Sequence, residues 1–372
     1  MGPAILIDKS AFQSFSEKEV FYLQSYYHVV YCPTLFYEVL ADLKKCEDEE
    51  ASKEEIRKVS YKINAHNTCF TADVRDLLIN DLLGYHLAMD GRPVLAGGKE
   101  VVDGEGKRAM YFDEQFEYVA LRRWTEGEFS EAEVMWAKNW RSSIGDIDLD
   151  IAKINAKHMQ QLSDITELRQ YTYNVIEQQE YQDDFLRFLL NRVGLDQKIR
   201  DKVFERWMKH GMPKIKDFAP YAYYCLTVYL SFYNGIAKNL IGTKSTNLID
   251  LEYILYMPFC RVFASTDKFH RDFSPLFLEE GQDFVWGNDL KNDLKSFCEY
   301  WEERGDSKRM DYKKEYGDYP PEIPGSLTCE LWRKHFGERS KRFGQIEVTP
   351  EREAEILKKI KPIIDKFKNK EG

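Results

Sequence analysis

Residues 262–273 read VFASTDKFHRDF, and residues 4–12 read AILIDKSAF. In each stretch, a short apolar run ends beside an aspartate and a serine. Runs that are apolar on both faces are typical of parallel strands buried in an α/β sheet. Ligands of open α/β sheets bind at the carboxyl ends of the strands, so two such ends predict a site, although Ser and Asp also serve ordinary turns. The four residues are Asp8, Ser10, Ser265 and Asp267.

The composition predicts a globular protein with a substantial core. The chain has 372 residues, of which 43% are hydrophobic and 14% aromatic, and this length suits one large domain or two modest ones. No apolar run approaches the ~20 residues that span a bilayer, and the first residues lack the features of a signal peptide. The seven cysteines are scattered without a Cys-x-x-Cys pair, which argues against zinc. We therefore expect a cytoplasmic protein with reduced thiols and no membrane partner.

The formal net charge of −10 argues against a protein that coats DNA without regard to sequence. It leaves nucleic acid open as a partner, because metal-binding carboxylates add negative charge that bound ions cancel locally. The C-terminal segment differs from this average: from Trp332 to Gly372, twelve Lys and Arg residues face seven Asp and Glu residues. This segment is either a binding face or a solvated helix, and the alternation of its acids with lysines favours the helix.

Strand and helix patterns alternate at both ends of the chain, and helical patterns fill the middle. Ser16 and Glu19 form a capping box, and Pro33 suits the first turn of a helix. We expect an α/β domain interrupted by a mainly helical insertion, followed by a proline-containing linker with a charged helical tail. The expected strands are 4–7, 29–32, 261–264 and 284–286. The expected domain consists of residues 1–45 and 215–300. The insertion is expected at 46–214, with a hairpin or loop at 91–106, and the linker and tail at 301–372.

Four acidic residues stand in an ordered set that resembles the PIN-domain nuclease family. The family has an Asp after its first strand, a Glu in its second helix, an Asp at the start of a later helix, and an Asp after the strand that follows. Ser265 matches a Ser or Thr two residues before the last Asp, and Asp272 matches an additional acid of some members. The matching segments are IDKS (7–10), PTLFYEVL (33–40), NLIDLEYILY (247–256) and FASTDKF (263–269), which carry Asp8, Glu38, Asp250 and Asp267.

The resemblance covers about 130 residues and departs from the family in spacing, since 212 residues separate Glu38 from Asp250. It implies a PIN-like three-layer α/β/α fold with a mostly parallel central sheet. It also implies a carboxylate cluster that holds Mg²⁺ or Mn²⁺, which are hard cations that prefer oxygen ligands. An insertion of this length explains the spacing and leaves the middle of the chain outside the resemblance.

The chemistry of such a cluster assigns a role to each residue. Asp8, Asp250 and Asp267 would ligate the metal, with Asp272 as an additional ligand, and Glu38 would ligate it or hold a metal-bound water. Whether Asp42 also joins the cluster is open. Ser10 and Ser265 would hydrogen-bond carboxylates or phosphate. Arg271 would contact a substrate phosphate or pair with Asp272, and His270 is expected to be a loop histidine rather than a base.

The predicted function is metal-dependent hydrolysis of phosphodiester bonds, with RNA favoured over DNA. The family resemblance also implies roles as a toxin or in antiphage defence, and the insertion is expected to bind a protein partner or a second copy of the chain. Two alternatives stay open. One is a non-catalytic PIN-like protein that binds a protein or nucleic acid through the insertion and the basic tail. The other is an α/β protein with an unrelated function.

Overall fold

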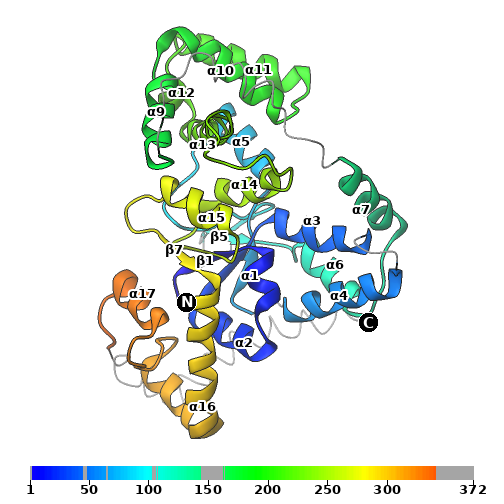
Figure 1. Cartoon of the computed structure of the whole chain (residues 1–372), viewed down its shortest axis with the longest axis vertical. Helices are drawn as coiled ribbons and strands as arrows, with labels where there is room; N and C mark the ends of the chain where they lie inside the picture. The colour runs from blue at the N-terminus through cyan, green and yellow to red at the C-terminus, as the bar shows by residue number, and fades with distance from the viewer. Residues whose placement is uncertain are drawn as a thin grey trace.

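The structure, a computed structural model, describes residues 2–44, 48–63, 66–102, 106, 108–143, 162 and 164–340. A five-stranded sheet lies at its centre, with helices on both faces (Figure 1). Every neighbouring pair of strands in this sheet is parallel, which confirms the expected α/β class. In chain order the strands are β1 (Ala4–Ile7), β2 (His28–Tyr31), β3 (Thr68–Phe70), β6 (Val262–Ser265) and β7 (Asp283–Trp286).

Strand β1 is the middle strand, in the order β3-β2-β1-β6-β7. Its residue Ile5 is in register with Val29 of β2 on one side and with Val262 of β6 on the other. Residues 5–7 are completely buried, because helices cover the sheet on both faces. The apolar run at the start of the chain therefore became the centre of the sheet, as its lack of alternation predicts.

The chain changes direction across the sheet between β1 and β6. From β1 it proceeds outward to β2 and β3, and it later returns to β6 and proceeds to β7 on the other side. The connections that leave β1 and β6 thus run in opposite directions, and ligands of open α/β sheets bind at such a point, outside the carboxyl ends of the two strands. Asp8 directly follows β1, and Asp267 lies two residues beyond β6.

Helices form a layer on each face of the sheet (Figure 1). One layer contains α1 (Lys9–Ser14), α2 (Glu17–Tyr26) and α16 (Gly287–Tyr316), and the other contains α13 (Pro220–Ala237), α14 (Asn247–Leu255) and α15 (Lys268–Phe273). The expected capping box begins α2: the Ser16 amide donates to Glu19 Oε2 at 2.7 Å, and the Glu19 amide donates to Ser16 Oγ at 3.3 Å. These two hydrogen bonds satisfy backbone N–H groups that have no partner within the helix at its start.

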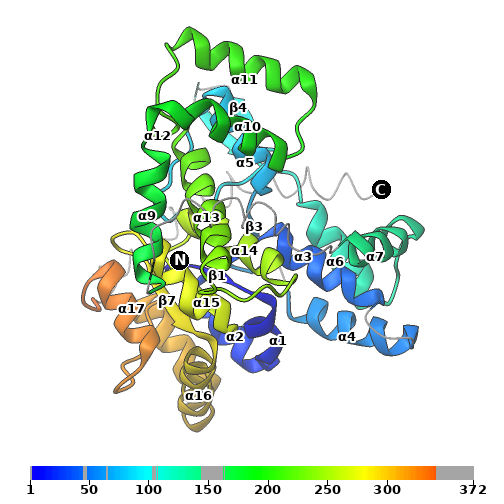
Figure 2. The ribbon, with the colours of Figure 1, turned by 45° about the horizontal axis from the view of Figure 1, so that its top comes forward.

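The middle of the chain is mostly helical, and Figure 2 shows α9 (Thr166–Ile176), α10 (Gln182–Arg192) and α12 (Ile215–Phe218) beside α13. One continuous hydrophobic core nevertheless includes residues of the sheet and of α13. No helix within the described ranges is long and apolar enough to cross a membrane. The remaining elements are α3 (Pro33–Ala41), η1 (Asp42–Lys44), α4 (Glu49–Lys62), α5 (Val74–Leu83), β4 (Lys99–Val102), β5 (Arg108–Tyr111), α6 (Phe116–Thr125), α7 (Glu131–Ser143), α9 (Thr166–Ile176), η2 (Gln179–Tyr181), α10 (Gln182–Arg192), α11 (Gln197–Lys209), α12 (Ile215–Phe218), η3 (Met257–Phe259), η4 (Ser274–Phe277) and α17 (Leu327–Phe336).

The structure differs from the sequence-based expectation at one edge of the sheet. Strand β3 comes from within residues 46–214, all of which were expected to belong to the insertion. Its three residues, Thr-Cys-Phe, are too few to show a strand pattern. The antiparallel pair of β4 and β5 forms the hairpin expected near the glycine-rich segment. The part of the basic tail at 341–372 lies outside the described residues.

Candidate functional site

Asp8 is the most firmly held carboxylate at the carboxyl edge of the sheet. It is 3% exposed and caps α1, with its Oδ1 accepting from the Ala11 amide at 2.8 Å. Its Oδ2 accepts from two serine hydroxyls, Ser10 and Ser265, each at 2.7 Å. The expected contact of both serines with a carboxylate is thus present. Ser10 reaches Asp8 from α1 and Ser265 reaches it from the end of β6, so this one side chain joins the two central strands.

His270 links three elements of the edge and is completely buried. Its Nε2 lies 2.7 Å from the backbone oxygen of Asp250, so this nitrogen donates, since a carbonyl only accepts. Its Nδ1 lies 2.7 Å from Ser265 Oγ and 3.5 Å from Asp8 Oδ2. Burial lowers the pKa of His270, but its interactions with Asp8 and Asp250 outweigh burial and raise the pKa overall. The expected loop histidine is therefore an internal tie between α14, β1 and β6.

Asp267 lies at the start of α15 and is partly exposed. Its Oδ1 accepts from the Phe269 amide at 2.7 Å, which caps the helix, and its own amide donates to Ser265 Oγ at 2.9 Å. Its second carboxylate oxygen has no hydrogen-bond donor among the described residues. Like Asp8, this residue is a helix cap at the end of a central strand.

Glu38 approaches the edge from α3 and is held by residues distant in sequence. Its Oε2 accepts from the Tyr253 hydroxyl at 2.5 Å. The Lys9 ammonium lies 3.0 Å from the Glu38 backbone oxygen and 2.7 Å from Asp42 Oδ2. Burial raises the pKa of Glu38, and the charges of Asp8 and Asp42 raise it further, while Lys9 and Tyr253 oppose the rise. An internal cation thus partly compensates the acids of α3 and η1.

Asp250 completes the set from the first turn of α14. Burial raises its pKa to about 7; His270 opposes this rise, and the negative charges of Asp267, Glu38 and Asp8 add to it. Burial is the largest of these causes, and the three negative charges are smaller ones. The geometric link to the other acids is His270, which donates to the Asp250 backbone oxygen and lies 3.5 Å from Asp8 Oδ2. The fold therefore brings all four acids of the expected set to one edge of the sheet: Asp8, Glu38, Asp250 and Asp267.

Asp272 and Arg271 do not join this group. Both are exposed on α15, and Arg271 Nε donates to Asp272 Oδ1 at 3.0 Å. The Arg271 guanidinium also lies over the Trp286 ring, 5.3 Å from its centre. Of the two roles expected for Arg271, the structure shows the pairing with Asp272. Asp272 is not among the charges that shift the pKa of Asp250 or of Glu38.

The four acids suit a hard cation in their chemistry, because all are oxygen donors and their mutual repulsion would fall when a cation binds. Their spacing is less favourable. In the part of the chain that the structure describes, no three His, Cys, Asp or Glu side chains are placed to hold one ion. Asp8 Oδ2 already accepts two hydrogen bonds, so it could bind a metal only if a serine hydroxyl moved away, whereas Oδ1 accepts one and keeps a lone pair.

Three residues of the site were not predicted as members: Lys9, Tyr253 and His270. Lys9 directly follows Asp8, and Tyr253 lies three residues after Asp250, on the same face of α14. These spacings offered a weak signal. Their partners are distant in sequence, since 215 residues separate Tyr253 from Glu38, and no local pattern could reveal them.

No protein-family model, no curated protein and no solved structure matches the chain. The resemblance to PIN-domain nucleases therefore depends on the four short segments and on the position of their acids at the sheet edge.

Proposed function

We propose that the chain is a metal-dependent nuclease that hydrolyses phosphodiester bonds, with RNA as the favoured substrate. One observation carries this proposal: four carboxylate residues from four separate segments meet at the edge where the sheet changes direction, where hydrogen bonds join Glu38 to Tyr253 of α14 and His270 to the backbone of Asp250. Like charges gathered at the ligand-binding edge of an α/β sheet favour a cationic ligand. The PIN-like assignment of the fold is part of the same proposal.

Asp8, Glu38, Asp250 and Asp267 would hold Mg²⁺ or Mn²⁺. Such ions supply an activated water and stabilise the leaving oxygen of a phosphodiester. Asp8 and Asp267 are fixed by the caps of α1 and α15, and would orient the cation relative to the sheet. Asp250 has a pKa of about 7, so it gives up its proton near neutral pH, and a bound cation would favour that loss.

The chain's other residues at the edge position these acids. His270 and Ser265 join the Asp8 carboxylate to the first turn of α14, and Tyr253 fixes the direction of the Glu38 carboxylate. Lys9 neutralises Asp42, which is buried beside Glu38. These contacts leave Asp250 and the outer oxygen of Asp267 as the acids with the fewest hydrogen bonds.

A specific observation also favours the non-catalytic alternative. Asp8 accepts three hydrogen bonds within the protein, and no three potential ligands among the described residues surround one ion. A carboxylate satisfied in this way can simply hold β1 and β6 together. In this second candidate, the chain is a PIN-like interaction protein that binds a protein or nucleic acid through its middle helices and basic tail.

Cleavage assays with metal distinguish the two candidates. Labelled single-stranded RNA and DNA are incubated with the full chain in Mn²⁺, Mg²⁺ or EDTA. The nuclease proposal expects cleavage that needs metal and is lost in Asp8→Asn and Asp267→Asn, each by more than the ~10–100-fold typical of an outer-shell partner. Asp311→Asn, an exposed acid on α16, serves as the matched control and should cut like wild type.

A second measurement reports on the metal without a substrate. Mn²⁺ should raise the melting temperature of wild type, because a ligand that binds only the folded state stabilises it. The rise should disappear in Asp250→Asn. A wild type that neither cuts any substrate nor gains stability with Mn²⁺ or Mg²⁺ would support the interaction protein instead.

A further inference from the structure

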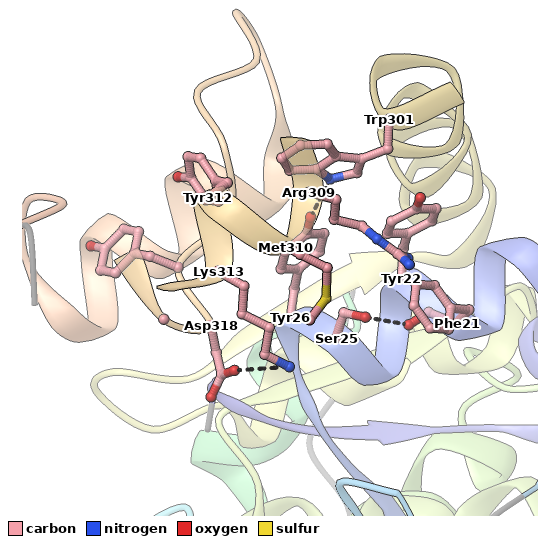
Figure 3. Close-up of a pocket in the computed structure, with 12 residues that line it drawn as sticks. Phe21, Tyr22, Ser25, Tyr26, Trp301, Arg309, Met310, Tyr312, Lys313 and Asp318 are labelled. Carbon is pink, nitrogen blue, oxygen red and sulfur yellow. Dashed lines mark hydrogen bonds and ion pairs between the residues drawn. The ribbon is translucent and has the colours of Figure 1, made fainter. Parts of the chain in front are cut away.

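A small aromatic pocket lies between α2 and α16, away from the acidic edge (Figure 3). It exists because α16 is broken at Gly305, which has φ +79° and ψ 162°. This backbone conformation is essentially restricted to glycine. The residues after the break, including Arg309 and Tyr312, line the pocket together with residues of α2.

Aromatic rings form much of the wall. The rings of Tyr22 and Tyr26 stack along α2, and Trp301 meets Tyr312 edge to face with 5.5 Å between ring centres. The cavity has a volume of about 110 Å³. An engineered cavity of ~150 Å³ lined by apolar side chains binds benzene, so this smaller pocket would enclose part of one six-membered ring, with the rest of a ligand at its exposed rim.

One polar group inside the pocket has an unused hydrogen. The Tyr26 hydroxyl accepts a hydrogen bond from Trp301 Nε1 at 2.8 Å, and Tyr26 is only 6% exposed. Among the described residues, none accepts the hydrogen of this hydroxyl. A buried donor without an acceptor is unfavourable, so a ligand ring that carries an acceptor, such as a carbonyl oxygen, would gain from this group.

Two cations stand at the rim of the pocket. The Arg309 guanidinium lies over the Phe21 ring, 4.7 Å from its centre, and the Lys313 side chain is exposed. Arg309 pairs with Asp306 at 2.9 Å through one of its nitrogens, which leaves further donors, and Lys313 lies 3.7 Å from Asp318. Guanidinium and ammonium groups are the usual ligands of phosphate. A ligand that has both an aromatic ring and a phosphate would contact the rings of the wall and the unused donors of these two cations.

We propose that this pocket binds a pyrimidine nucleotide. The base would lie among Tyr22, Tyr26 and Trp301, one of its carbonyl oxygens would accept the Tyr26 hydroxyl hydrogen, and the phosphate would face Arg309 and Lys313. The ligand is either a free nucleotide or one nucleotide of an RNA strand, since the chemistry is shared. The site is independent of the acidic edge and stands whether or not that edge cleaves nucleic acid.

Calorimetric titration of the full chain in EDTA tests this site. Uridine monophosphate and cytidine monophosphate should bind. Ribose 5-phosphate, which lacks the base, should bind at least about 10-fold more weakly, a difference of ~1.4 kcal/mol. Phenyl phosphate, which lacks the carbonyl, should bind roughly 5-fold more weakly, the loss of about one hydrogen bond. A short oligouridylate distinguishes the two possible ligands. If it binds more tightly than the mononucleotide, the ligand is an RNA strand; if it binds equally, the ligand is the free nucleotide.

Two variants assign the binding to this pocket. Tyr26→Phe removes the hydroxyl and should weaken uridine monophosphate binding by roughly 5-fold, about one hydrogen bond. Lys313→Gln, an exposed change that leaves the fold intact, should weaken binding and reduce its dependence on salt. Tyr300→Phe is the matched control, because this tyrosine is on α16 but outside the pocket. The proposal is overturned if millimolar nucleotide does not bind, if ribose 5-phosphate or phenyl phosphate binds equally well, or if both variants bind like wild type.

Discussion

The acids that end strands and the acids carried by helices are held differently at the same edge. Asp8 and Asp267 each cap a helix and accept a backbone amide, and Asp8 also accepts two serine hydroxyls. Glu38 accepts one hydroxyl, and no described residue donates to the Asp250 carboxylate. Hydrogen bonds favour the charged form of an acid, whereas burial without them favours the neutral form. The strand ends thus supply carboxylates fixed in place by hydrogen bonds, and the helices supply carboxylates whose pKa is raised, chiefly by burial.

The largest expected effect on stability is at Asp8, which joins the ends of β1 and β6. Asp8→Ala removes the acceptor of three hydrogen bonds, one of them from the fully buried Ser265, and should lower the free energy of unfolding by about 3 kcal/mol or more. Urea unfolding measures this loss. Asp272→Ala, an exposed acid, is the control and should change stability by less than about 0.5 kcal/mol. Similar stabilities for both variants would contradict the role of Asp8 in joining β1 and β6.

The next effect concerns pH and the helix acid Asp250. Its pKa in the folded chain, about 7, exceeds its ordinary value of 3.8, so the folded state binds more protons between these values. Stability in EDTA should therefore fall as pH rises from about 4 to 7, because deprotonation favours the unfolded chain. Asp250→Asn removes this contribution and should be more stable than wild type at pH 8 by about 2 kcal/mol. This is less than the whole pKa shift would give at ~1.4 kcal/mol per pKa unit, because water partly reaches the side chain.

Denaturant unfolding at pH 5 and pH 8 checks this prediction. Other acids with raised pKa values, such as Glu38, contribute in the same direction, so the difference between wild type and Asp250→Asn isolates the one residue. Equal pH dependence of stability in both proteins would show that folding does not raise the pKa of Asp250.

The smallest effect on stability is expected at Asp267. Asparagine caps helices about as well as aspartate, so Asp267→Asn should change the free energy of unfolding by less than about 0.5 kcal/mol, whereas Asp267→Ala should cost about 1 kcal/mol. Both changes are measured by urea unfolding. If the proposed nuclease is correct, Asp267→Asn keeps its fold and loses cleavage, and this combination separates a ligand from a mere cap. Cleavage retained by a folded Asp267→Asn would remove this residue from the metal site.

The sequence revealed those parts of the fold and site that depend on local patterns. The central strands could be predicted because residues 5–7 and 262–264 are apolar without alternation, and Asp8 and Asp267 follow from where those runs end. Strand β3 could not, since three residues carry no periodicity. The ties made by Lys9, Tyr253 and His270 depend on contacts across the fold, which a single sequence does not display.

The broken helix also could not be foreseen. A glycine within a helical pattern is usually tolerated, and only the conformation of Gly305 shows that the second half of α16 departs from the first. The pocket that follows from this break joins residues of α2 and α16 far apart in sequence.

The central position of β1 has a consequence for the newly made chain. Its two neighbours are β2, which follows within the first 31 residues, and β6, which begins at Val262. At synthesis rates of roughly 5–20 residues per second, Asp8 waits about 13–50 s before Asp267 is made. During that time the edge of β1 that pairs with β6 has no strand beside it, and unpaired strand edges promote aggregation. The acidic edge cannot assemble on the ribosome until β6 emerges, so any activity that needs both strand ends begins only late in synthesis.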